Sequence, residues 1–319
     1  MSVFAEIRQA CAAVARQSTW VELNSAQLEL LAEDFIASSR AGSPADPAHH
    51  PRGDAESTLA FVLILDAVNF GSGWVPHLEK RPGASGYFTI AAGLQDHFDA
   101  HGAPTARALE NMESGDCARI FGQQPGRSPI SDLMELFAQS WRDLGGLVVR
   151  EFEGSFVEMV GAARRSAANL VEILSSMPLY QDVEDYRGMR VPFFKRAQIT
   201  CSDLAEAFEG AGPGRFEDLD DLTLFADNLV PHVLRREGVL AYEPELLARI
   251  DAGQLIALGS QEEIEIRAVA LHAVERLSET LEGRGCSAPP RRLDAWLWHR
   301  GQAASMKAEP RHRTRCPYY

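Results

Sequence analysis

The 319-residue sequence predicts a mainly α-helical protein that folds as a single compact domain over residues 1–319, with at most minor strands. Two observations lead to this prediction. Apolar residues recur at the three- and four-residue spacing of helices in successive segments, whereas the alternation typical of strands is scarce. Apolar residues also form 45% of the chain and charged residues 24%, a balance typical of a globular protein with a substantial core.

The first half of the chain contains most of the helical patterns. In the second of them Leu28, Leu31 and Phe35 recur at helical spacing, and Ser25 is a suitable N-terminal cap. The run before Asn69 is apolar on all sides, which favours a buried helix over a strand. The predicted helices cover residues 3–16, 25–40, 57–70, 87–100, 107–121, 131–144 and 156–176.

The second half alternates turns with helices. One short extended piece is expected at 188–194, and a Gly-Pro-Gly turn lies within 210–214. The acidic residues of 217–221 are placed on a solvated helix face. Further helices are predicted at 243–252, 260–282 and 293–301, the middle one capped by Ser260 with Glu263 as its capping-box partner. The tail 311–319 is basic, a composition usually solvated, but its last four residues could pack.

Charge and cysteine content exclude several functional classes. The net charge of −14 argues against a nucleic acid polymer as partner, whereas a single phosphate needs only one or two cations. The five cysteines are scattered, without metal-ligand spacing, and we expect no metal, no cofactor and no disulfide framework. The sequence contains neither a signal-peptide pattern nor an apolar run of membrane-spanning length, which predicts a cytoplasmic protein with no membrane contact. We also expect a monomer.

Two charged residues stand in apolar surroundings. Asp227 lies within the apolar run 224–231, where ionisation costs free energy unless a partner or substrate compensates. Lys195 follows the aromatic pair Phe193 and Phe194. A structural ion pair between Asp227 and Lys195 is one interpretation, and a catalytic site is the other.

Asn69, Phe70 and Trp74 surround a glycine-rich break after the apolar run. Aromatic rings stack on flat heterocycles and an amide reads their edges, so this segment is a candidate site for a planar base. The alternative is that Asn69 caps the end of a helix.

These segments carry a resemblance to a known family. The sequences FFKRAQI and FADNLVP around Lys195 and Asp227 resemble those of the queuosine salvage protein family, the queuosine 5'-phosphate N-glycosidases. Three further segments agree in order, namely Val68-Asn69-Phe70 with Trp74, Glu262 to Ala268, and Leu293 to Trp298. The ending Arg313 to Tyr319 is similar too.

The resemblance implies a helical fold like that of helix-hairpin-helix DNA glycosylases, with the 210–214 turn as the hairpin. It also implies hydrolysis of the N-glycosidic bond of queuosine 5'-monophosphate, which releases queuine for salvage into tRNA modification. Asp227 and Lys195 are then the expected catalytic residues. The expected substrate-binding residues are His49, Asn69, Phe70, Trp74, Phe194, Gln198, Asn228, Glu263 and Trp298.

Two functions are compared at this point: this N-glycosidase, and a non-catalytic binding protein for a 7-deazaguanine or purine-like base. Only the enzyme needs a desolvated carboxylate, because a fixed negative charge stabilises an oxocarbenium-like sugar. Asp227 therefore favours the enzyme. A 7-deazaguanine base has no N7 to protonate, so we expect Asn69 and Gln198 to assist its departure by hydrogen bonds. Lys195 has two candidate partners, Asp227 in the free protein or the 5'-phosphate of the ligand.

Overall fold

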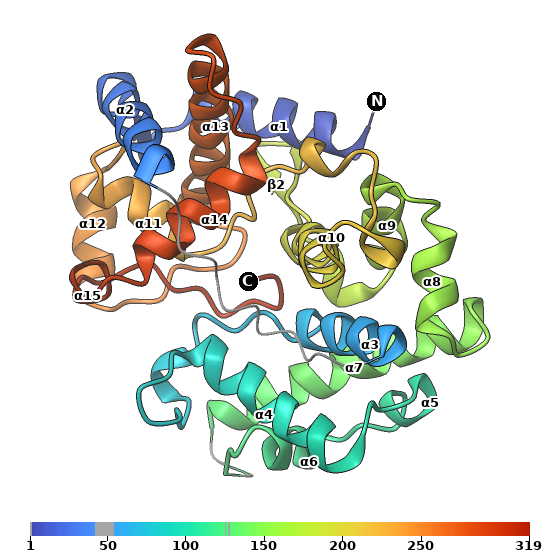
Figure 1. Ribbon diagram of the computed structural model, residues 1–319. Helices are drawn as coiled ribbons and strands as arrows, with labels where there is room; N and C mark the ends of the chain where they lie inside the picture. Colours follow the sequence, from blue (N-terminus) through green and yellow to red (C-terminus); the bar gives the residue numbers. More distant parts are fainter. Residues whose placement is uncertain (1, 42–53, 125, 127) are drawn as a thin grey trace.

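The prediction of a mainly helical chain is confirmed by a computed structural model, which describes residues 2–41, 54–124, 126 and 128–319. Helices dominate these residues, and strands are few and short (Figure 1). The α-helices are α1 (Val3–Gln17), α2 (Ser25–Ala41), α3 (Ala55–Asp66), α4 (Gly86–His101), α5 (Ala106–Leu109), α6 (Ser114–Ile120), α7 (Ile130–Glu151), α8 (Phe156–Ala162), α9 (Ala167–Leu174), α10 (Lys195–Ala207), α11 (Leu229–Arg236), α12 (Pro244–Asp251), α13 (Gln261–Gly283), α14 (Pro290–Gly301) and α15 (Ala304–Lys307).

The strands form two small antiparallel pairs in the described ranges. In one pair β1 (Val21–Leu23) joins β4 (Leu240–Tyr242), with Val21 opposite Tyr242. In the other β2 (Val183–Tyr186) joins β3 (Met189–Pro192), with Val183 opposite Pro192. The second pair confirms the extended piece expected at 188–194, and its partner strand β2 was not predicted.

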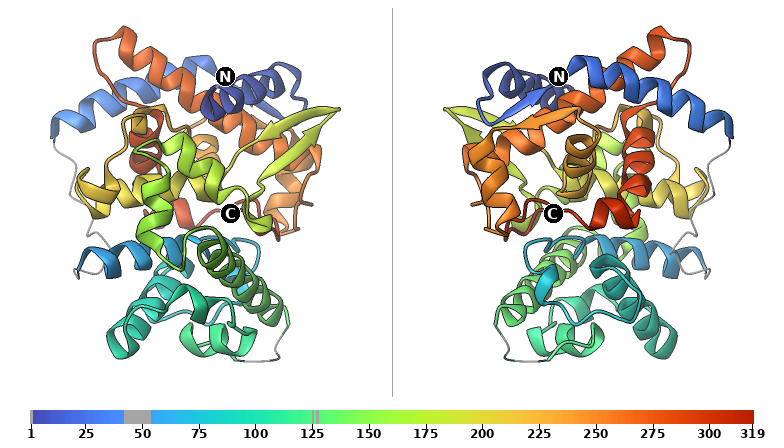
Figure 2. Two further views of the ribbon diagram at one scale, coloured as in Figure 1. Left: turned by 90° about the vertical axis from the view of Figure 1, so that its right-hand side faces the viewer. Right: turned by 90° about the vertical axis from the view of Figure 1, so that its left-hand side faces the viewer.

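The helices gather in two groups with the end of the chain between them (Figures 1 and 2). Helices α4 to α7 lie together at the bottom of Figure 1, with α3 directly above them. At the top, α13 packs against α1, α2, α11 and α14. Buried apolar side chains from Phe4 to Leu297 form one connected cluster. This continuity supports the single domain expected over 1–319, which stays a prediction.

Two expected helices are interrupted. The segment 156–176 divides into α8 and α9 because Arg164 and Arg165 adopt left-handed backbone conformations, with φ of 52° and 62°. The segment 107–121 likewise divides into α5 and α6. Long side chains at a helix break have no distinctive sequence pattern. Helical periodicity therefore predicted one continuous helix in each of these two segments.

The acidic segment 217–221 matches the predicted solvated helix face only in part, since Glu217, Asp220 and Asp221 are exposed but Asp218 is not. Its residues 219–221 form the short 3-10 helix η4 (Leu219–Asp221), and Asp218 turns toward α9. The Asp218 carboxylate accepts hydrogen bonds from the backbone N–H groups of Ala167 and Ala168, at 2.5 and 3.1 Å. Asp218 therefore supplies the acceptors that the first turn of α9 lacks.

The Gly-Pro-Gly turn forms another 3-10 helix, η3 (Gly212–Gly214), which packs against α10. The likeness of this turn to the hairpin of DNA glycosylases stays a prediction. Among the described residues, no helix is both long enough and apolar enough to cross a membrane.

Candidate active site

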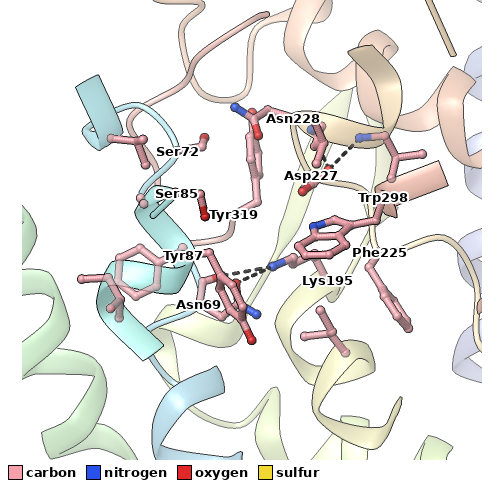
Figure 3. A pocket seen from close by; sticks show the side chains of 18 of the residues that line it. Asn69, Ser72, Ser85, Tyr87, Lys195, Phe225, Asp227, Asn228, Trp298 and Tyr319 are labelled. Carbon is pink, nitrogen blue, oxygen red and sulfur yellow. Dashed lines mark hydrogen bonds between the residues drawn. The ribbon is translucent and has the colours of Figure 1, made fainter. Parts of the chain in front are cut away.

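A cavity of about 280 Å³ lies where α3, α4, α10, α14 and the C-terminal tail meet. Six of the predicted residues line it: Asn69, Phe70, Lys195, Asp227, Asn228 and Trp298. In Figure 3, Asn69 and Tyr87 lie on one side of this space and Phe225 and Trp298 on the other, with Asp227 above Lys195. The structure therefore brings together residues that are up to 229 positions apart (298 − 69) in the sequence.

Asp227 lies two residues before α11 and holds the start of this helix. Its Oδ1 accepts hydrogen bonds from the backbone N–H groups of Leu229 and Val230, at 2.8 and 3.1 Å. These two donors fix the orientation of the carboxylate. The side chain is partly exposed and borders the cavity, so its Oδ2 is the oxygen available to a ligand.

Lys195 begins α10 and projects its ammonium toward the end of α3. Nζ donates hydrogen bonds to the backbone oxygen and to Oδ1 of Asn69, at 3.1 and 3.3 Å (Figure 3). Burial lowers the pKa of Lys195, while the nearby charges of Asp227 and Asp66 oppose that shift. In the described part of the chain no ion pair joins Lys195 to Asp227, so the simple structural pair is not formed.

A buried ion-pair network holds both of these residues from behind. The guanidinium of Arg267 binds the Asp182 carboxylate through two nitrogens, at 2.7 and 2.9 Å. Arg267 Nε also donates to the backbone oxygen of Ala226, next to Asp227, at 3.0 Å. Asp182 Oδ2 accepts the backbone N–H of Lys195 at 3.1 Å. The network therefore fixes the backbones of Lys195 and Asp227 relative to each other.

Gln198 acts as a second link between the same two segments. Its side chain donates to the backbone oxygen of Phe193 at 2.8 Å and accepts the backbone N–H of Thr223 at 2.9 Å. Gln198 is fully buried and does not line the cavity. The expected hydrogen bond from Gln198 to the base therefore has no support in this geometry.

Three other predicted residues also lie behind the cavity wall. Phe194 is buried, and its left-handed backbone (φ 48°, ψ 41°) starts α10. Glu263 is buried and accepts a hydrogen bond from the hydroxyl of Tyr319, at 2.9 Å. Trp74 is buried outside the lining. We expect these side chains to support the wall rather than to contact a ligand. His49 lies outside the described residues.

The C-terminal tail closes one side of the cavity, as its composition allowed. The backbone oxygen of Tyr319 accepts N–H groups of Gly71 and Ser72, at 3.0 and 3.3 Å, and the Tyr319 side chain lines the cavity. A Cβ atom on Gly73 would lie 2.5 Å from the backbone oxygen of Thr314. Glycine at position 73 therefore permits the close approach of the tail.

Aromatic rings form part of the apolar lining, together with aliphatic side chains. Phe70 packs edge-on against Phe137, with ring centroids 5.0 Å apart. Trp298 makes edge contacts with Tyr87 and Phe88, at 6.5 and 6.1 Å. Rings fixed in this way present faces and edges on which a flat base can pack.

Two further carboxyl groups near Lys195, those of Asp66 and Asp203, were not predicted. Asp66 is buried, and its carboxylate interacts with the side chains of Asn69 and Asp203. Burial raises the pKa of Asp66 to about 6, and the Lys195 charge opposes this. Burial and the charge of Asp66 raise the pKa of Asp203, which lines the cavity. This pair takes up a proton more readily than exposed aspartates do.

Sequence reasoning also missed Asp294 and Arg311, which both line the cavity. Asp294 belongs to the Leu293–Trp298 segment and lies one helical turn before Trp298, a spacing that places both on one helix face and could have revealed it. Arg311 lies in the C-terminal tail, where a basic residue is usually predicted to be exposed to solvent. No group of three or more His, Cys, Asp or Glu side chains in the described ranges could hold a metal ion. The expected independence of a metal stays a prediction.

Fold and cavity together define a mainly helical protein with a ligand pocket that combines carboxylates, a lysine and aromatic rings. Residues 49–319 match the family model described as "Queuosine salvage protein". The chain therefore belongs to the queuosine salvage protein family.

Curated relatives extend this assignment over nearly the whole chain. The chain is 36% identical over 309 residues to a protein of Sphaerobacter thermophilus, covering 95% of this chain and 94% of the relative. It is 33% identical over 288 residues to a mouse protein, covering 85% and 84%, and 31% identical over 329 residues to one of Dictyostelium discoideum, covering 98% of both. All three relatives are named queuosine 5'-phosphate N-glycosylase/hydrolase.

Proposed function

We propose that this protein is a hydrolase that cleaves the N-glycosidic bond of queuosine 5'-phosphate and releases the base queuine. The observation that carries the proposal is the cavity in which Asp227, Lys195 and Asn69 lie among aromatic rings. The names of the relatives supply the substrate and the reaction. A non-catalytic binding protein would use the rings and the amide, but it has no use for the Asp227 carboxylate.

In this proposal Asp227 supplies the negative charge at the reacting carbon. Departure of the base makes C1' of the ribose oxocarbenium-like, and a fixed carboxylate stabilises that charge. The helix start holds Asp227 through Oδ1, which leaves Oδ2 to face the sugar or to accept a proton from the attacking water. The network through Arg267 and Ala226 keeps this carboxylate in place.

The base is expected to lie between Phe70 and Trp298, with its edge toward Asn69. Asn69 is oriented because its oxygens accept from the Lys195 ammonium, so the amide nitrogen of its side chain is the group available to a ligand. Asn228 is less available, since its Nδ2 donates to the backbone oxygen of His312 at 3.3 Å. We therefore assign Asn69 the larger part in recognising the base.

Arg311 is the better candidate for the 5'-phosphate. Its partly buried guanidinium lines the cavity and forms no hydrogen bond or ion pair with any residue that the structure describes. Burial lowers the pKa of Arg311, and the charge of Asp227 opposes this shift, so the two groups are close enough to interact. A desolvated guanidinium without a protein partner is suited to binding a phosphate. Lys195, already bound to Asn69, remains a second candidate.

The direct test incubates the purified protein with queuosine 5'-phosphate and follows free queuine by chromatography. We expect release of the base with the phosphorylated substrate and slower release with the nucleoside. Binding of the nucleotide without release would instead support the binding protein.

We further propose that the protein is a monomer in the cytoplasm that binds no nucleic acid polymer. The five cysteines are all free, which fits a reducing compartment, and the net charge of −14 disfavours a polyanion. Light scattering after gel filtration checks the oligomeric state, and a gel-shift assay with tRNA checks the partner.

A further inference from the structure

Asp294 lies in the same cavity as Asp227 but in a different environment. It projects from α14, is 7% exposed and borders the cavity. Its Oδ1 accepts the backbone N–H of Phe225 at 3.1 Å. Its Oδ2 has no hydrogen-bond partner among the residues the structure describes, and is therefore the oxygen that can meet a ligand.

The two carboxyls stand in different surroundings. Asp227 is partly exposed and accepts two backbone N–H groups at a helix start, whereas Asp294 is almost fully buried and accepts one. Burial and the neighbouring charge of Asp227 raise the pKa of Asp294 well above its ordinary value, against the opposing effects of the Phe225 N–H and of Lys195. A buried carboxyl with a raised pKa beside a second, more exposed carboxyl is an arrangement suited to a general acid.

Cleavage of the glycosidic bond creates a need for such an acid. The C1'–N9 electron pair leaves with the base, and a 7-deazaguanine offers no N7 to receive a proton. A proton must therefore reach another position on the departing ring, or the base must leave as an anion.

We propose that Asp294 is the general acid of the reaction, an inference that rests on the proposed N-glycosidase function. As the C1'–N9 bond breaks, the Oδ2 hydroxyl of Asp294 donates its proton to the departing base. Water forms the new bond to C1' and gives its proton to Asp227. Asp227 then carries the proton and Asp294 the charge, and transfer of that proton back to Asp294 restores the starting state.

Other charged groups around Asp294 are either paired or also line the cavity. On α14, Arg291 pairs with Asp220 of η4, and Arg300 pairs with Glu237 at the end of α11. From α10, Lys195 acts on Asp294 as described, and Asp203 and Glu206 line the same cavity. His299, Lys307 and Arg311 line the cavity from α14, α15 and the tail, and the phenols of Tyr87 and Tyr319 line it too.

The test is the pH dependence of turnover in Asp294→Asn. Asparagine keeps the acceptor for the Phe225 N–H but cannot transfer a proton. We expect kcat to fall by roughly 10²- to 10⁴-fold, the usual contribution of a general acid. Wild-type activity should decline at high pH as Asp294 loses its proton, and this decline should be absent in the variant. Asp251→Asn, at an exposed position of α12, is the control and should match the wild type.

Infrared spectroscopy tests the same proposal without turnover. The difference spectrum of wild type minus Asp294→Asn at neutral pH should show the C=O stretch of one buried protonated carboxyl, because any signal of Asp66 and Asp203 is common to both proteins and cancels. A second variant covers the possibility that Asp294→Asn does not fold. In Asp227→Asn the neighbouring charge is gone, so the same band should disappear at a lower pH than in the wild type.

Three outcomes separate the possibilities. Unchanged kcat and an unchanged pH profile in Asp294→Asn, with an active wild type, would overturn the acid role alone. A raised KM with normal kcat and no protonated band would show that Asp294 binds the base edge as a carboxylate, which also overturns it. A wild type that releases no base contradicts the proposed function itself.

Discussion

The buried network around Arg267 and the cavity around Asp227 handle charge in opposite ways. In the network, the side chains of Asp182, Glu263 and Arg267 are almost fully buried, and each has a partner within the protein. In the cavity, Asp294 and Arg311 line the wall with an oxygen or nitrogens that the described residues leave unpartnered.

This difference distinguishes charged residues that stabilise the fold from charged residues that are available to bind a ligand. The presence of a buried charge that is paired within the protein can be explained by stability alone, because removing either partner leaves the other buried without a counter-charge. A buried charge without a partner costs free energy in the free protein, and a ligand that supplies the partner recovers that cost. Substitutions in the network are therefore expected to lower the stability of the fold, and substitutions in the cavity to change substrate binding and turnover.

The largest effect should come from breaking the network. Arg267→Met leaves Asp182 and Glu263 buried without their cation, and we expect the free energy of unfolding to fall by about 3–5 kcal/mol in urea denaturation. The control is Arg249→Met, which removes the partly exposed pair with Glu262 and should cost about 1 kcal/mol or less. Equal losses of unfolding free energy in the two variants would show that the buried network contributes no more to stability than a partly exposed ion pair.

A smaller and more selective effect is expected at Arg311. Arg311→Gln should raise KM for queuosine 5'-phosphate by roughly 10- to 100-fold, the value of one charged hydrogen-bonding partner, and change turnover of the nucleoside little. Arg291→Gln is the matched control, because Arg291 also lines the cavity but is paired with Asp220. Equal losses on nucleotide and nucleoside would assign the phosphate elsewhere, with Lys195 as the next candidate.

The smallest effect is expected at Asn69. Asn69→Ala removes an amide that can read the edge of the base, and queuine binding measured by calorimetry should weaken by up to roughly 10-fold. Asn111→Ala is the control, since the side chain of the exposed Asn111 donates to the backbone oxygen of Arg107 and does not line the cavity. Unchanged affinity in Asn69→Ala would count against its part in recognition.

Helical periodicity predicted most of the fold, since most helices bury an apolar stripe that is visible in the sequence. It failed where the backbone conformation of individual residues ends a helix. Arg164 and Arg165 are examples, because their left-handed conformations divide the segment 156–176 into two helices. It also failed at Asp218, which caps a helix that begins 51 residues earlier (218 − 167). Contacts of that kind depend on tertiary packing and have no local pattern.

The candidate site was predicted in part for a similar reason. Short segments identified Lys195, Asp227 and Asn69 because their family resemblance is local. Within those segments, however, the sequence could not tell a side chain that faces the cavity from one that faces the core. Gln198 lies one turn of α10 beyond Lys195, yet it is fully buried and holds Thr223. Arg311 is the reverse case, a tail residue that packing directs inward.

The central claim is that the charge of Asp227, not its shape, drives cleavage of the glycosidic bond. The most direct measurement compares turnover and nucleotide binding in Asp227→Asn and in Asp221→Asn, whose side chain is exposed. Asparagine retains the oxygen that accepts from Leu229 and Val230, so α11 keeps its cap. We predict a fall in turnover of roughly 10³-fold or more for Asp227→Asn with binding of queuosine 5'-phosphate retained, beside a fully active Asp221→Asn. An Asp227→Asn protein that still releases queuine at the wild-type rate would contradict this account.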